Sequence, residues 1–503
     1  MNKIIIFIEA VGKIRSLQRS LNALEMDADI IATKGHLYAN SQHLFPVGIN
    51  EHFEETGRQA INQKLIDKIK STSGMYRHYL IATDPDQEGD VIAEDIANLI
   101  PEQKLLRVNL HGLDADSIYS ALKTAKAYNP ELSWPGTCRR ILDRVLGASF
   151  TNQFENISVG RVQSALLGAI HEKPQVFGVA NLAMKDKLGG QDFECEIEVT
   201  HANHASIKRI VESLKTTPLS ASVKLNQNAT ASEPWNYAEC VFYCAQRLNA
   251  STAEVDTAMQ KLYEDGLLSY LRSSAKALSK DALACLSNIA NSQSGRHQLQ
   301  VDRVQIISQH DAHESPRPLG LVDISLPLKL MDFNTAVLTM ITRNLVRCGT
   351  EGVDEIPDTS ILPEWAQSLP WKRTRYATLS WRDSKPKNEI SLMAIDVALL
   401  GVMNRYQLGR PGTQVDHVQR FMQKKLVHSD LNLTTEGKRW VSKTHPQFLS
   451  PKNSAYIENL IADNADLPPS VRAAWIVKEL GPQVSETALS TIQMKTQHNS
   501  RAS

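Results

Sequence analysis

The sequence predicts a multidomain protein in which an N-terminal α/β domain is followed by α+β domains. Its 503 residues suffice for roughly three to four domains of the usual size. Over the first 130 residues, short apolar runs alternate with helical patterns, which is typical of a mostly parallel sheet. Further along, arginine-rich helical stretches give way to strand-like alternation, which indicates an inserted sheet.

The composition is that of a folded protein and names no partner. Lysine plus arginine and aspartate plus glutamate each number 55, and 42% of the residues are apolar, which excludes the disordered class. No apolar run approaches the roughly 18 residues of a membrane helix, and the N-terminal run is too short for a signal peptide. We therefore expect a cytoplasmic protein without a membrane partner. The six cysteines contain no C-x-x-C pair, which argues against a zinc ribbon or a disulfide framework.

The N-terminal pattern gives four expected strands, at 4–8, 30–33, 79–83 and 105–110. A helix is expected over Val91–Ile100, where apolar residues recur at helical spacing up to Pro101. Residues 84–89 then form a strand-to-helix loop. In open α/β sheets, functional groups lie at the carboxyl ends of the strands, where this loop and Glu9 would both lie.

In the rest of the chain the pattern is largely helical, and an order of helix, strand and helix occurs twice. Residues 135–172 have a helical pattern, and 193–199 alternate like a strand. A helix at 254–264, a turn at Asp265-Gly266, a strand at 267–272 and a helix at 279–289 resemble a winged helix. The same order recurs at 415–425, 426–433 and 434–442. The polar tail after about Pro468 is expected to be frayed.

The acidic loop carries the strongest local signal for chemistry. Asp84, Asp86, Glu88 and Asp90 lie within seven positions, and a hard divalent cation such as Mg²⁺ would relieve their mutual repulsion. The alternative is a solvated turn that caps the next helix, since carboxylates favour helix N-termini. Glu9 lies just before Gly12-Lys13, and this segment is either a second acidic arm beside a phosphate-binding lysine or a plain strand end.

Two further groups could act on phosphate. On a strand, Tyr270 and Arg272 would point to one face and could meet one phosphate, although such a pair more often serves packing. Basic residues cluster at Arg139-Arg140, Arg144, Arg161 and Arg410, where arginine suits bidentate phosphate contact but also occurs on solvated helix faces. The run from His310 to Pro318 lacks zinc-protease spacing, and no P-loop motif indicates nucleotide hydrolysis.

Taken in order, these segments resemble the type IA DNA topoisomerases over most of the chain. The matching motifs are Phe7–Lys13 (V-E-S-P-x-K), Ala32–Leu37 (T-x-G-H-l), Asp84–Asp90 (D-x-D-R-E-G-E), Arg139–Gly147 (R-R-x-x-D-R-x-x-G), Ser158–Ser164 (S-A-G-R-V-Q-S), Leu262–Arg272 (L-Y-E-x-G-L-I-T-Y-M-R), Ala312–Pro318 (A-H-E-A-I-R-P) and Leu408–Thr413 (I-G-R-P-S-T). The departures are Ala10-Val11 for Ser-Pro, Gln87 for Arg, Asp90 for Glu, and Ser273-Ser274-Ala275 for Thr-Asp-Ser. The nucleophile and the three carboxylates of the family are retained, and the C-terminal zinc ribbons common in the family are not seen.

The resemblance implies a toroidal core with winged-helix-like domains. The implied division is 1–132 for a Toprim domain, 133–175 with 396–465 for a basic domain that lines a single-strand groove, 176–232 with 319–395 for an arch, 233–318 for a winged-helix-like domain that carries the tyrosine, and 466–503 for a tail.

The resemblance also implies an ATP-independent reaction on single-stranded or underwound DNA. Tyr270 is the implied nucleophile, which forms a 5′-phosphotyrosyl link before strand passage and religation, with relaxation and decatenation both open. The other implied catalytic residues are Arg272, Lys13, Glu9 and His313. Mg²⁺ would be held by Glu9, Asp84, Asp86 and Glu88. The implied DNA-binding residues are Arg139, Arg140, Asp143, Arg144, Arg161, Gln163, Arg317 and Arg410.

Two other readings stay open. Another Toprim enzyme, such as a nuclease or primase, would keep the acidic loop but has no use for Tyr270 and Arg272. The second alternative is a relative that binds single-stranded DNA without cleaving it, and the altered residues after Arg272 favour this alternative.

Overall fold

The computed structural model describes residues 4–101, 103–230, 232–292, 313–350, 352–376, 388–464 and 466–493. The chain divides into two compact units. Unit 1 comprises Met1–Gly168, Glu264–Gly266 and Trp440–Ser503, and unit 2 comprises Ala169–Tyr263 and Leu267–Arg439. No helix within the described ranges is long and apolar enough to cross a membrane.

A five-stranded sheet organises the N-terminal part of unit 1, as the alternating pattern predicted. Its order is β2-β1-β5-β6-β7, and only the last pairing is antiparallel. The strands are β1 (Ile4–Ile8), β2 (Ala28–Ala32), β5 (His78–Ile81), β6 (Leu105–Arg107) and β7 (Lys126–Ala127). The surrounding elements are α1 (Lys13–Ala23), α2 (Gln63–Lys70), α3 (Gln87–Leu99), α4 (Ala115–Lys123) and the small pair β3 (Tyr38–Ala39) and β4 (Gln59–Ala60).

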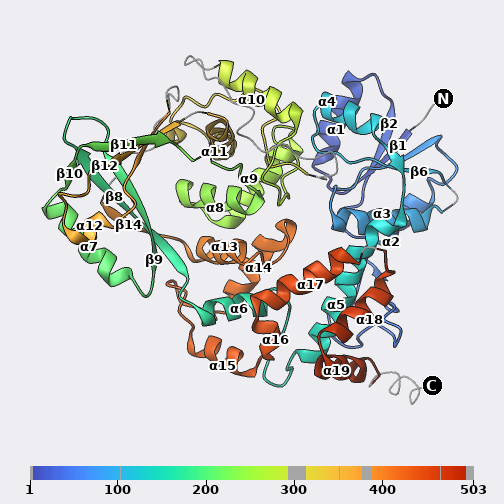
Figure 1. Ribbon diagram of the computed structural model, residues 1–503. Helices are drawn as coiled ribbons and strands as arrows, with labels where there is room; N and C mark the ends of the chain where they lie inside the picture. The colour runs from blue at the N-terminus through green and yellow to red at the C-terminus, as the bar shows by residue number, and fades with distance from the viewer. Residues whose placement is uncertain are drawn as a thin grey trace. The chain divides into compact units, whose positions relative to one another are not determined.

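Helices cover both faces of this sheet (Figure 1). Ile5 and Phe7 pack with Ile66 of α2 and Ile92 of α3 in one buried core, while α1 contacts α4 and β2. The side chains of a strand alternate between faces, so β1 is buried on both sides. The predicted helix at 91–100 begins earlier than expected, at Gln87, because Asp86 caps it by accepting a hydrogen bond from the Gly89 amide.

A second core of unit 1 is helical. Its helices are α5 (Trp134–Phe150), α16 (Pro446–Leu449), α17 (Pro451–Asp463), α18 (Pro469–Glu479) and α19 (Pro482–Gln493). The short η1 (Pro130–Ser133) precedes α5, and α6 (Gln163–Glu172) begins in unit 1 and continues into unit 2. The apolar side of α5 packs against α17, α18 and α19. The expectation of a frayed tail after Pro468 was wrong up to Gln493, because Ala473, Ile476, Val484 and Ala488 are buried in this core.

Unit 2 contains two sheets and a group of helices. In one sheet β8 pairs with β9, β10 and β14, and the other has the order β11-β12-β13. The strands are β8 (Val176–Asp186), β9 (Phe193–Thr200), β10 (Ser220–Ala221), β11 (Val223–Asn228), β12 (Gly352–Pro357), β13 (Arg373–Tyr376) and β14 (Glu389–Leu392). The helices are α7 (His204–Thr216), α8 (Tyr237–Leu248), α9 (Thr252–Glu264), α10 (Lys280–Ser292), η3 (Leu328–Leu330), α11 (Phe333–Cys348), α12 (Glu364–Gln367), α13 (Ile395–Arg405) and α14 (Pro411–Gln423). The last helix, α15 (Thr435–Lys443), begins in unit 2 and ends in unit 1.

The two predicted winged-helix strands are reduced to single bridges. Leu268 bridges Pro318 in the first, and Val427 bridges Leu433 in the second. The expectation of a regular strand at 267–272 was therefore wrong, although the flanking helices α9 and α10 form as predicted. The five-domain division is finer than the two units and stays a prediction.

Candidate functional site

The first group of candidate residues lies at one edge of the sheet in unit 1. Parallel β1, β2 and β5 end there, and backbone hydrogen bonds from Thr33 to Ile8 and from Ala82 to Phe7 continue the ladders to this edge. Glu9 directly follows β1 and is half-buried, and Lys13 is the first residue of α1. Asp84 follows β5. The structure thus brings together side chains from two chain segments, as the carboxyl-end rule predicted.

Each carboxylate of the acidic loop contacts a partner. The Lys13 ammonium contacts the Asp84 carboxylate, and both residues are buried. Asp86 is held as the cap of α3 through the Gly89 amide, 2.8 Å from its Oδ1. These contacts relieve the repulsion that crowding would cause, and in the buried pair the charges are matched.

Two further partners were not singled out by the sequence analysis. His36, from the loop after β2, lies with Nε2 2.8 Å from Glu88 Oε2, and this hydrogen bond holds the pKa of Glu88 below its usual range despite burial. Arg107 of β6 donates to the carbonyls of Thr83 and Asp84 and pairs with Asp90. Burial raises the pKa of Asp90 more than Arg107 lowers it. Only the T-x-G-H-l motif signalled His36, and nothing local signalled Arg107.

The donor set of this edge suits a hard divalent cation, because Glu9, Asp84, Asp86 and Glu88 offer only oxygen atoms. Among the described residues, however, no three His, Cys, Asp or Glu side chains converge on one point that could hold a metal ion. The chemistry of the donors fits the predicted ion, whereas Lys13 takes up part of the negative charge and His36 occupies one oxygen of Glu88 through a hydrogen bond.

The second group lies in unit 2, on the extended segment that follows α9. Tyr270 is 3% exposed, and its ring centroid is 5.4 Å from that of His313 and 5.8 Å from that of Tyr263. Arg272 lies two residues further, and its side chain passes beside Gly412, where an added Cβ would be 3.2 Å from Arg272 Cδ. The structure therefore brings Tyr270 to His313, and Arg272 to the segment that contains Arg410.

Hydrogen bonds hold this segment in place without a regular strand. Ser269 and Arg317 are joined by two, from the Ser269 amide to the Arg317 carbonyl and from the Arg317 amide to the Ser269 hydroxyl. The amide of Tyr237, at the start of α8, donates to the carbonyl of Ser273. Arg317, a predicted DNA contact, pairs through its guanidinium with Glu314. His310, Asp311 and Ala312 of the predicted cluster lie outside the described residues.

The predicted DNA-binding arginines of unit 1 are engaged within the protein. Arg140 pairs with Glu55, and Arg144 donates to the carbonyls of Ser41, His43, Pro46 and Val47. Arg139 and Arg161 share Glu458, and Arg161 also pairs with Asp143. Gln163 is half-buried as the first residue of α6. Glu458 was missed by the sequence analysis, because about 300 residues separate it from both arginines.

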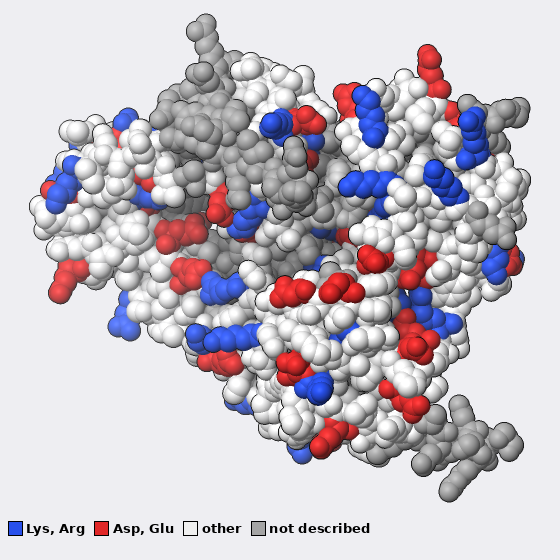
Figure 2. Space-filling model, turned by 45° about the vertical axis from the view of Figure 1, so that its right-hand side comes forward, with Lys and Arg blue, Asp and Glu red and all other residues white. Residues whose placement is uncertain are grey.

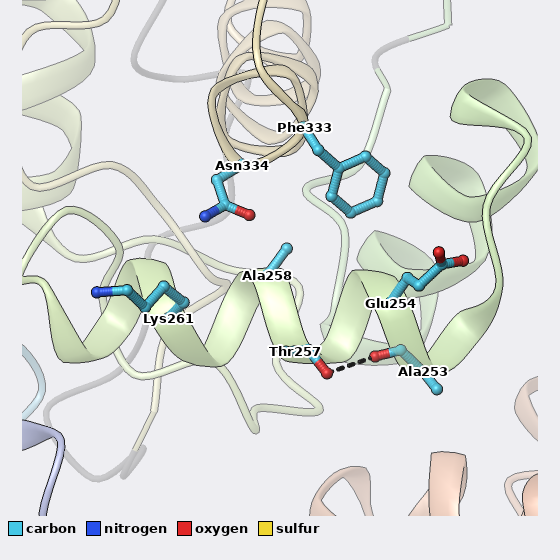
Figure 3. A pocket seen from close by; sticks show the side chains of 7 residues that line it. All are labelled: Ala253, Glu254, Thr257, Ala258, Lys261, Phe333 and Asn334. Carbon is cyan, nitrogen blue, oxygen red and sulfur yellow. Dashed lines mark hydrogen bonds between the residues drawn. The ribbon is translucent and has the colours of Figure 1, made fainter.

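Neither the surface charge nor the cavity lined by α9 and α11 indicates a different functional site. On the face shown in Figure 2, basic and acidic side chains are intermixed, in keeping with the balanced composition. A cavity of about 460 Å³ is lined by α9 and the start of α11, and Figure 3 shows its lining side chains. Its lining residues are Ala253, Glu254, Thr257, Ala258, Lys261, Phe333 and Asn334, and they include no predicted site residue.

Comparison with known proteins gives two family matches. A family described as DNA topoisomerase matches residues 127–391, which is more than half of the chain, and the Toprim domain matches residues 4–112. The second match contains β1, β2, β5 and β6 of the five-stranded sheet and its acidic edge, and the first includes Tyr270 and Arg272.

Individual relatives agree with these matches. DNA topoisomerase 1 of Campylobacter jejuni is 26% identical over 64% of this chain and 50% of its own length. The protein of the same name from Escherichia coli is 23% identical over 67% of this chain and 43% of its own length. The chain thus spans about half the length of such relatives. The structure of full-length topoisomerase I from Thermotoga maritima superposes with a TM-score of 0.64 at 17% identity, over 97% of this chain and 90% of that one, which shows a shared fold.

Proposed function

The chain belongs to the type IA DNA topoisomerase family, and from this premise we propose that it cleaves, passes and rejoins DNA strands. The observation that carries the proposal is that one chain combines the acidic edge at Asp84 with a tyrosine segment in which His313 lies against the Tyr270 ring. A nuclease or primase would need the first feature only.

The proposed reaction is a reversible transesterification. The Tyr270 hydroxyl oxygen attacks a backbone phosphorus and gives up its proton to water, and the bond from phosphorus to the 3′-oxygen breaks. The products are a 5′-phosphotyrosyl ester and a free 3′-hydroxyl. After a second DNA segment has passed, the 3′-oxygen attacks the same phosphorus and releases the tyrosine. One ester replaces another at each step, so the reaction needs no nucleotide cofactor.

The proposed roles follow from charge and proton balance. Arg272 and Lys13 would neutralise the negative charge that develops on the phosphorus oxygens. Glu9 would protonate the leaving 3′-oxygen and take that proton back on religation. His313 lies against the Tyr270 ring, which supports a role in donating a hydrogen bond to the scissile phosphate.

A divalent metal ion, generally associated with Toprim domains, would bind at the acidic edge, and we propose Mg²⁺. Glu9, Asp84, Asp86 and Glu88 would hold it. When bound, the ion would supply positive charge that helps to fix the DNA backbone. In this conformation the Lys13 ammonium already pairs with the Asp84 carboxylate, so an ion bound by Asp84 would have to displace it or share that carboxylate.

The test uses single-stranded oligonucleotides labelled at the 5′ or 3′ end, incubated with the protein with and without Mg²⁺ and run on denaturing gels. We expect a covalent adduct that retains the fragment with the 5′-phosphate, and its loss in Tyr270→Phe. Tyr263→Phe is the matched control, because it removes the hydroxyl of the neighbouring buried ring and keeps the proposed nucleophile.

An adduct that persists in Tyr270→Phe would refute the assignment of the nucleophile. Binding of the oligonucleotide without any adduct, in a correctly folded protein, would refute catalysis and favour a DNA-binding relative. Given an adduct, assays on supercoiled plasmid and on linked circles would separate relaxation from decatenation.

A further inference from the structure

Helices from distant parts of unit 1 meet at a cluster of two arginines and two carboxylates. Arg139 and Asp143 lie on α5, Arg161 precedes α6, and Glu458 lies on α17. The Glu458 carboxylate accepts from both arginines: Arg139 Nη2 is 2.8 Å from its Oε2, and Arg161 Nη1 is 2.8 Å from its Oε1. We call these four residues the arginine–glutamate cluster.

Every guanidinium nitrogen of the cluster has a protein acceptor. Arg161 also reaches Asp143 through Nε, at 2.6 Å, and through Nη2, at 3.1 Å. Arg139 directs Nε to Glu458 and donates from Nη1 to Gln87 Oε1, at 2.7 Å. In this conformation the two arginines therefore act as internal cross-links, and a DNA phosphate could bind bidentately only by replacing one of the acceptors.

Burial shows which side of the cluster faces water. The side chains of Arg139 and Arg161 are 10% and 3% exposed, whereas those of Glu458 and Asp143 are 28% and 50% exposed. The carboxylates thus separate the guanidinium groups from solvent. Burial acts to raise the pKa of Glu458, but Arg161 and Arg139 outweigh it and hold that pKa well below its usual range, so the carboxylate stays charged at neutral pH.

Glu458 is the acceptor that a phosphate can best replace. Its two oxygens bridge the two arginines, and a phosphodiester also offers two charged, unesterified oxygens that suit guanidinium forks. Asp143, by contrast, lies one turn from Arg139 on α5 itself and holds Arg161 through two bonds. Exchange of Glu458 for one phosphate would preserve the charge balance, with two arginines against Asp143 and the bound anion.

We propose that Arg139 and Arg161 form a binding site for one DNA backbone phosphate, which the Glu458 carboxylate occupies in the free protein and vacates when a strand binds. The proposal rests on the proposed function in that the strand is DNA. It makes Glu458 an internal competitor that weakens strand binding, rather than a residue that only supports the fold.

The experiment compares Glu458→Gln with the unchanged side chain, both in a Tyr270→Phe background so that no covalent adduct contributes. Glutamine keeps the shape and one acceptor but removes the competing charge. Fluorescence anisotropy with a labelled single-stranded oligonucleotide is expected to show about tenfold tighter binding, because the strand no longer has to displace a charge-assisted contact. The slope of log affinity against log salt is expected to steepen by about 0.7.

Asp95→Asn is the matched control, because it also frees a largely buried arginine of unit 1, Arg58, outside the cluster. Its strand affinity is expected to stay unchanged. A gain shared by both variants would reveal a general charge effect and overturn the proposal. Unchanged or weaker binding by Glu458→Gln would also overturn it, since a purely structural Glu458 predicts that result. If Glu458→Gln does not fold, Glu458→Asp keeps the charge, shortens its reach and is expected to tighten binding in the same direction.

Inorganic phosphate separates this proposal from the proposed function. Phosphate is expected to raise the melting temperature of Glu458→Gln more than that of the parent or of Asp95→Asn, because the vacated site binds the anion in the native state. That result in a protein that binds no oligonucleotide would support the anion site while refuting the DNA function. An equal phosphate effect in all three proteins would overturn the anion site.

Discussion

Replacing Gly89 by alanine is expected to damage the acidic edge, and the structure gives the size of the effect. A Cβ at Gly89 would lie 2.0 Å from the Asp84 carbonyl oxygen and 2.8 Å from its carbon, far inside ordinary contact. The Asp84 backbone would have to move by more than about 1 Å, since carbon and oxygen rarely approach closer than about 3.4 Å. Gly89 thus allows the first turn of α3 to lie directly against the backbone of Asp84.

Two opposing free-energy terms decide the stability of Gly89→Ala. Alanine favours a helix over glycine by about 1 kcal/mol. Overpacking against a backbone that cannot move freely costs about 1–3 kcal/mol. We therefore expect a net loss of up to about 2 kcal/mol, which lowers the melting temperature by up to about 8 °C. Because a shift of about 1 Å at reacting groups can cost about 10²-fold in rate, adduct formation is expected to fall by about that factor.

Thermal unfolding followed by circular dichroism and the adduct assay measure these two effects. Gly147→Ala, in α5, is the matched control, since its Cβ would meet only ordinary contacts at 3.8 and 4.0 Å. It is expected to be neutral or up to about 1 kcal/mol more stable than the parent. If Gly89→Ala matched Gly147→Ala in stability and formed adduct at the parent rate, the steric argument would be refuted.

Three other predictions concern the helical part of unit 1. The stabilisation that Glu458 provides through its lowered pKa is fully present above the unfolded-state pKa of about 4.3 and is lost as pH falls through the folded-state pKa. Below about pH 4.3, denaturant titrations should therefore show that the free energy of unfolding falls less steeply with pH for Glu458→Gln than for the parent, and equal pH slopes would contradict this. Arg472→Leu is expected to cost about 1–3 kcal/mol in urea unfolding, because the fully buried guanidinium donates to the carbonyls of Ile461 and Leu467; no change would show that these carbonyls find other donors. Arg144→Ala is expected to speed proteolysis within 41–47, whose carbonyls Arg144 binds, and an unchanged cleavage pattern would refute that role.

The sequence by itself determined the features whose signals are local. Apolar runs and helical spacing predicted β1, β2, β5, β6 and α3, because periodicity reflects which faces of an element are buried. The order of short motifs identified the family, and the carboxyl-end rule predicted that Glu9 and Asp84 lie at one edge. The residue types in these motifs, a tyrosine followed by an arginine and a loop of carboxylates, already indicated the chemistry.

Only the tertiary structure decided which partner each charged group has. Lys13 contacts Asp84 across 71 positions, and Arg139 reaches Glu458 across 319, distances over which no local pattern carries information. The segment at 267–272 was predicted to be a strand, yet its pairing is limited to one bridge, because strand formation depends on the neighbour that the fold supplies. The segment after Pro468 looks polar in sequence. It nevertheless forms α18 and α19, because α5 offers a surface against which their apolar residues are buried.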